Sequence, residues 1–76
     1  MLRLQAERER RGVTRKELAE MALLSNGRVG SFESGRATPP RDGVELRRLA
    51  RVLGLPEADA GALLDEVGDR EPAERQ

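Results

Sequence analysis

The sequence has 76 residues with 14 basic and 14 acidic side chains, one Phe, and no Trp, Tyr, Cys or His. This length fits one small domain. The missing Cys and His exclude disulfides, thiolate metal sites, a cysteine nucleophile and the commonest general base. We therefore expect no enzyme activity, metal, cofactor or small-molecule substrate. No apolar run reaches the ~18 residues of a membrane span, so no membrane association is expected.

The zero net charge is the sum of two oppositely charged parts. Residues 1–51 carry 12 basic and 7 acidic side chains, whereas residues 52–76 carry 2 basic and 7 acidic ones. Their net charges are therefore +5 and −5. This distribution is typical of a body that faces a polyanion and has an acidic end.

Two helices are predicted at the start of the chain. Residues 2–11 are good helix formers, and Gly12 ends the helix because Gly is favoured just past a helix end. Thr14 and Glu17 have the spacing of a capping box, which predicts a second helix of about two turns. Its buried face consists of Leu18, Ala19 and Ala22.

A third helix is predicted over Asn26–Ser34. Ser25 is a good N-cap for it, and Gly35 ends it. Val29 and Phe32, three residues apart, form its buried face. The opposite face carries small or polar residues, and one of them is an arginine. The set is Asn26, Gly27, Arg28 and Ser31.

Two more helices are predicted after a Pro-containing loop over residues 36–41. Asp42 is expected to cap the fourth helix with Glu45 as its capping-box partner, and the buried residues are Leu46, Leu49, Ala50 and Leu53. Pro56 is tolerated at the first position of the fifth helix, whose apolar residues are Ala60, Leu63, Leu64 and Val67. Gly61 makes this the weakest of the helices.

The chain has no alternation of apolar and polar residues of strand length. Residues 68–76 are polar, charged and contain Pro, which is typical of a disordered tail. The sequence therefore predicts an all-α domain of five helices over residues 1–67, followed by a disordered acidic tail.

The second and third helices are short, a few residues separate them, and the outer face of the third is small and polar, which describes a helix-turn-helix. Residues 12–35 resemble the Cro/cI repressor-type (XRE) family in Gly12-Val13-Thr14, Leu18-Ala19, Ser25, Val29 and Glu33-Ser34-Gly35. The resemblance extends from Leu4 to Val67 and implies a compact phage-repressor-like fold. Leu23 stands where this family usually has a small residue, often Gly, and the loop after Gly35 is longer than usual.

The resemblance implies a sequence-specific DNA-binding transcriptional regulator, most simply a repressor. Such a protein binds a palindromic operator in double-stranded DNA as a homodimer, through the major groove. It would be cytoplasmic and of bacterial, phage or plasmid origin. The alternative is a protein-binding module, such as an antitoxin or an anti-repressor partner, whose acidic segment 57–76 docks a basic protein.

The resemblance also implies roles for individual residues. The expected base contacts, for which Asn suits adenine and Arg suits guanine, are Asn26, Gly27, Arg28 and Ser31. The expected phosphate contacts are Arg15, Ser25, Ser34, Arg36 and Arg41. Arg8 and Glu33 match a family ion pair that fixes the angle between the first and third helices. The candidate dimer seam, which could instead close the core of the monomer, is Leu63, Leu64 and Val67.

Overall fold

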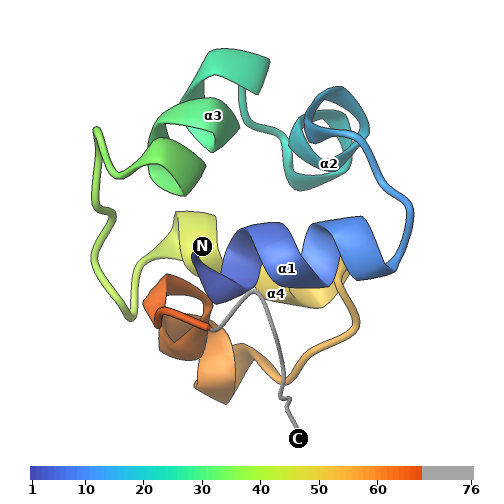
Figure 1. Cartoon of the computed structure of the whole chain (residues 1–76). Coiled ribbons are helices and arrows are strands. Elements are labelled where there is room, and N and C mark those ends of the chain that lie inside the picture. Colours follow the sequence, from blue (N-terminus) through green and yellow to red (C-terminus); the bar gives the residue numbers. More distant parts are fainter. Residues whose placement is uncertain (68–76) are drawn as a thin grey trace, which may run out of the picture.

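The computed structural model describes residues 1–67 as five helices joined by short connections (Figure 1). The helices are α1 (Arg3–Arg10), α2 (Arg15–Ala22), α3 (Asn26–Ser34), α4 (Val44–Val52) and the 3-10 helix η1 (Glu57–Leu64). The predicted all-α class and the five predicted helices are confirmed. The predicted tail, residues 68–76, lies outside the described residues.

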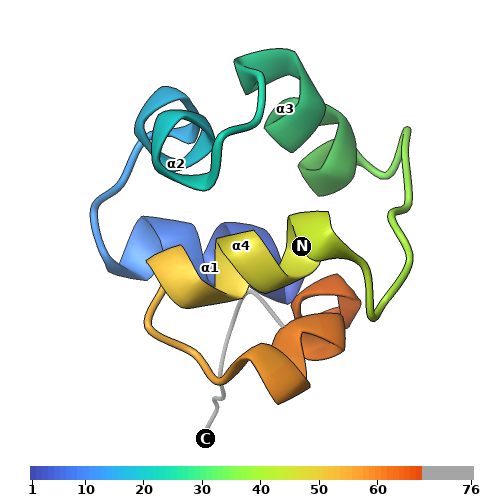
Figure 2. The ribbon, with the colours of Figure 1, turned by 180° about the vertical axis from the view of Figure 1, so that it is seen from behind.

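The helices enclose a single apolar core. α2 and α3 lie on one side of α1 and α4, and η1 lies on the other side (Figures 1 and 2). α4 packs against both α2 and η1. Each helix contributes at least one fully buried large side chain; the set is Phe32, Leu4, Leu18, Leu46, Leu49, Leu53, Leu63 and Val29. Burying one such side chain contributes about 1.5–3 kcal/mol, so these contacts hold the helices together.

Side-chain caps fix where α2 and α3 begin. The Thr14 hydroxyl accepts a hydrogen bond from the Glu17 N–H at 3.1 Å, and the Glu17 carboxylate accepts one from the Thr14 N–H at 2.9 Å. At the start of α3, the Ser25 hydroxyl accepts from the Arg28 N–H at 3.0 Å. Both predicted N-caps are confirmed, and they place the two helices of the motif at the expected residues.

The turn between α2 and α3 holds Leu23 in a left-handed backbone conformation, with φ 61° and ψ 40°. The Leu24 N–H donates to the Ala19 carbonyl at 2.8 Å, and the Leu23 N–H donates to the Glu20 carbonyl at 3.3 Å. These bonds satisfy the last carbonyls of α2 in the manner of a Schellman motif, whose left-handed residue is usually Gly. Leu23 therefore carries a steric cost in this turn, and its side chain is 75% exposed.

Replacing Leu23 with Gly is expected to raise the free energy of unfolding by about 0.5–1 kcal/mol. Gly removes the ~1–2 kcal/mol cost of a left-handed non-Gly residue, and its greater freedom in the unfolded chain offsets part of the gain. Thermal unfolding followed by far-UV circular dichroism measures the difference. Leu23→Ala is the matched control, because it removes the exposed side chain and keeps the backbone cost. A Gly variant no more stable than the Ala variant would contradict the assignment of strain.

The start of α4 differs from the prediction. Gly43 is its N-cap, no side chain makes a cap hydrogen bond there, and Asp42 is exposed. The Glu45 carboxylate binds Arg28 instead of the backbone. Here the carboxylate accepts two charge-assisted hydrogen bonds, from Nε and Nη2 of the guanidinium, and together these outweigh a single cap bond. The predicted Asp42 capping box was therefore wrong.

The fifth helix is more tightly wound and ends earlier than predicted. Pro56 precedes η1 as its N-cap rather than occupying its first position. Gly61 weakens the preference for an α-helix. The spacing of Ala60 and Leu63, both buried, also fits the three residues per turn of a 3-10 helix. A Cβ at Gly61 would lie 3.1 Å from the Arg41 Cβ, so the glycine lets the loop approach η1 closely.

The residues after η1 lie beside the start of the chain. The Arg3 N–H donates to the Asp65 carbonyl at 2.8 Å, and the Val67 N–H donates to the Met1 carbonyl at 2.9 Å. Between these bonds, Leu2 and Glu66 form an isolated antiparallel bridge. Val67 therefore belongs to this pairing and not to the fifth helix.

Candidate nucleic-acid interface

An open hollow lies over the outer face of α3. Its lining residues come from the start of α2, from α3 and from the residue after Gly35, and they are Arg15, Asn26, Gly27, Gly30, Ser31, Ser34 and Arg36. Six of these seven are residues that the sequence predicts to contact DNA. The lining includes two guanidinium groups and no carboxylate. The structure thus brings most of the predicted site together on one positively charged face.

Sequence reasoning missed Gly30, the seventh lining residue. The signal was present, because Gly30 is three residues after Gly27 and therefore shares its helix face. A Cβ at Gly27 would meet nothing within 4 Å, whereas one at Gly30 would lie 3.7 Å from Nη1 of Arg15. The two glycines leave the middle of the hollow without side chains, so a ligand can approach the α3 backbone.

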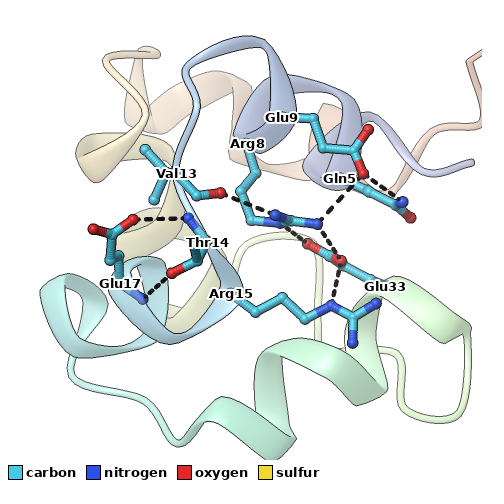
Figure 3. Close-up of polar contacts among 8 residues, drawn as sticks. All are labelled: Gln5, Arg8, Glu9, Val13, Thr14, Arg15, Glu17 and Glu33. Carbon is cyan, nitrogen blue, oxygen red and sulfur yellow. Dashed lines mark hydrogen bonds and ion pairs between the residues drawn. The ribbon is translucent and has the colours of Figure 1, made fainter.

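A buried carboxylate at the end of α3 joins three helices (Figure 3). Glu33 accepts hydrogen bonds from Nε of Arg8 at 2.7 Å and from Nη2 of Arg8 at 3.2 Å. It also accepts one from Nε of Arg15 at 3.0 Å. Its side chain is 1% exposed. The structure contains the expected ion pair between Arg8 and Glu33, and it adds Arg15 from α2 as a second cation.

Arg8 is held at both ends of its guanidinium. While Nε and Nη2 donate to Glu33, Nη1 donates to the Val13 carbonyl at 2.9 Å (Figure 3). Three of the five N–H donors of Arg8 are thereby bonded within the protein. This arrangement connects α1 to the residue just before α2, and through Glu33 to α3. The charged cluster thus joins α1 and α3 beside the apolar core that they share.

Arg28 lies on a different side of α3 from the hollow. Its Nε and Nη2 donate to the two carboxylate oxygens of Glu45 at 2.9 and 3.0 Å, and its guanidinium carbon lies 4.7 Å from the centre of the Phe32 ring. The hydrogen bonds from Arg28 lower the pKa of the Glu45 carboxyl, and the same bonds raise the pKa of Arg28. The structure does not bring Arg28 together with Asn26 and Ser31.

Two of the five expected phosphate contacts, Arg41 and Ser25, also lie outside the hollow. Arg41 donates from Nη1 to the Gly61 carbonyl at 2.9 Å and from Nη2 to the Asp65 carboxylate at 3.0 Å. These bonds tie the loop before α4 to η1. Ser25 is exposed, and its hydroxyl caps α3.

The candidate dimer residues differ in exposure. Leu63 is fully buried in the core of the single chain, which is the alternative that the sequence left open. Leu64 and Val67 are partly exposed. Of the three candidates, therefore, only Leu64 and Val67 remain accessible to a second copy.

The described part of the chain offers neither a membrane span nor a metal site. None of its helices is long and apolar enough to cross a membrane. Nowhere in residues 1–67 do three or more His, Cys, Asp or Glu side chains gather as a metal ion requires.

A family model described as "Helix-turn-helix domain" matches residues 2–63, from the start of α1 to the last turn of η1. The chain belongs to the helix-turn-helix domain family. No curated protein and no solved structure matches the chain. Helix-turn-helix domains bind DNA through the second helix of the motif, which here is α3. The family thus implies DNA as the partner of this chain and a role in transcriptional regulation, and it is typically non-enzymatic.

Proposed function

We propose that the protein is a sequence-specific transcriptional regulator of the Cro/cI repressor type that binds a palindromic DNA operator as a homodimer. The observation that carries this proposal is the hollow over α3, because it gathers two arginines with small and polar residues on the helix that enters the major groove in this family. A repressor acts by occupying its operator, and this requires no catalytic group.

The small residues of the hollow suit close contact with base edges. Asn26, at the start of α3, has an amide that can donate and accept, which fits the N6 and N7 edge of adenine. Ser31, four residues after Gly27, lines the same hollow and can donate to a base or accept from one. Gly27 and Gly30 have no side chains, so base edges in the major groove can come close to the α3 backbone. Ser34, the last residue of α3, and Arg36, two residues further on, would contact phosphate oxygens.

A homodimer follows from the small size of this surface. One recognition helix contacts only a few base pairs, so two copies related by a two-fold axis are needed for a palindrome, with half-sites one DNA turn, ~34 Å, apart. We infer that Leu64 and Val67 contribute to the seam, since both are apolar and partly exposed.

Selection of duplexes from a randomised pool, followed by a salt titration on the selected sequence, tests the proposal. We expect a palindrome that binds two chains, with an affinity that falls steeply as salt rises. Arg36→Ala should weaken binding to all duplexes and reduce the salt slope by about one. Arg48→Ala is the matched control, because Arg48 is exposed on α4 and does not line the hollow. If no duplex is preferred over random DNA at low salt, the proposed function is wrong.

A further inference from the structure

We propose that Arg15, from the start of α2, is the arginine that recognises guanine in the operator, in place of Arg28 on the recognition helix. This inference rests on the proposed function and assigns one base contact within it. It starts from the contrast between the two guanidinium groups beside α3.

Arg28 is already engaged by the protein. Its Nε and Nη2 face both carboxylate oxygens of Glu45, and its guanidinium stacks over Phe32. To contact a guanine with the same edge, Arg28 would have to leave Glu45 and uncover a carboxylate beside the DNA. That exchange opposes binding to a polyanion, because an unpaired carboxylate repels phosphates. We therefore assign Arg28 to holding α3 against the start of α4.

Arg15 has the opposite arrangement. Only its Nε donates to a described residue, Glu33, so the two Nη groups are free of such bonds. Its side chain is 53% exposed and lines the hollow. The two Nη groups form the fork that pairs with O6 and N7 of guanine. The free edge of Arg15 is thus the edge that a guanine requires.

The position of Arg15 favours a base over a phosphate. Its Nη1 lies 3.7 Å from the place where a Cβ of Gly30 would be, so the guanidinium sits above the middle of α3. Base edges meet the face of a helix in the major groove, whereas phosphates flank it. Because α3 offers only short side chains to the hollow besides Asn26, Arg15 supplies the long side chain that this face lacks.

The guanidinium is also held in place before DNA binds. Glu33 anchors Nε of Arg15 at 3.0 Å, and Glu33 is in turn fixed by Arg8. A side chain that is already oriented loses less conformational entropy on binding. Glu33 thus acts as a positioning residue for the base contact, in addition to joining the helices.

Base preferences of the full chain, measured by selection from randomised duplexes, test this assignment. The wild-type protein should select a G·C pair at one position of each half-site. Arg15→Met keeps most of the aliphatic stem and removes every N–H donor, so it should reduce that preference by roughly tenfold or more. Arg28→Met, the matched control, should leave the preference unchanged. Uniform weakening by Arg15→Met on all sequences, or loss of the preference in Arg28→Met alone, would overturn the assignment.

A change on the DNA keeps the test independent of how well the variants fold. Replacing the selected guanine with 7-deazaguanine removes the N7 acceptor. The wild-type affinity should then fall by roughly tenfold, and the affinity of Arg15→Met should not fall further. An unchanged wild-type affinity contradicts the contact. A wild-type chain that selects no duplex overturns the proposed function as well, whereas a selective chain whose preference survives Arg15→Met overturns only this inference.

Discussion

Replacing Glu33 with Ala is expected to lower the free energy of unfolding by about 3–5 kcal/mol. The reason is that the Arg8 guanidinium, whose side chain is 10% exposed, would lose the buried carboxylate that accepts two of its hydrogen bonds. The half-exposed Glu9 carboxylate, 3.6 Å away, would compensate its charge only in part. Arg15 would lose its anchor at the same time. Because small domains have only a few kcal/mol of net stability, much of the variant should be unfolded under mild conditions.

Urea and thermal unfolding followed by far-UV circular dichroism measure this loss, since the chain has no Trp or Tyr for a fluorescence signal. Glu20→Ala is the matched control, because it removes an exposed carboxylate from α2 without opening the cluster. Its effect should stay within about 0.5 kcal/mol. Equal, small effects of the two substitutions would contradict the structural role of Glu33.

Phe32→Ala is expected to cost about 3–5 kcal/mol of stability as well. Phe32 is the largest of the fully buried side chains and the only aromatic residue in the chain. Its removal leaves a cavity beneath α3 and takes away the ring over which the Arg28 guanidinium lies. Both losses loosen the recognition helix, so stability and DNA affinity should fall together.

Phe32→Leu separates the two contributions. Leucine fills most of the cavity, and it removes the ring and thus the cation–π contact, which is worth about 0.5–1 kcal/mol at an exposed site. We expect the Leu variant to unfold well above the Ala variant in temperature and a little below wild type. If the Leu and Ala variants unfold at the same temperature, the cavity does not cause most of the lost stability.

Local rules predicted much of the fold. The caps at Thr14 and Ser25 depend on groups three residues away, so their sequence spacing was sufficient to locate the starts of α2 and α3. The same rule failed at Asp42, because Glu45 has a distant partner, Arg28, that binds it more strongly than a backbone N–H does. Local spacing cannot reveal such a competitor.

The candidate site was predicted in part for the same reason. Helix periodicity placed Asn26, Gly27 and Ser31 on one face, and they do line one hollow. The bond between Arg15 and Glu33 joins residues 18 apart in the chain, and no spacing rule indicates it. Arg41 was assigned from its place in a loop. The contacts that hold it come from Gly61 in η1 and from Asp65 just after it, which pack there only in the folded domain.

The pairing of residues 1–3 with residues 65–67 bears on how the domain folds. These backbone hydrogen bonds join the two ends of the described chain, and they form only after α1 and η1 have both reached the core. Contacts between residues far apart in sequence lose more loop entropy before they form and slow folding relative to helical proteins with only local contacts. The ends also protect each other once formed, because fraying at residues 1–3 must break the bonds that hold residues 65–67. We therefore expect the first and last helices to open as one cooperative unit.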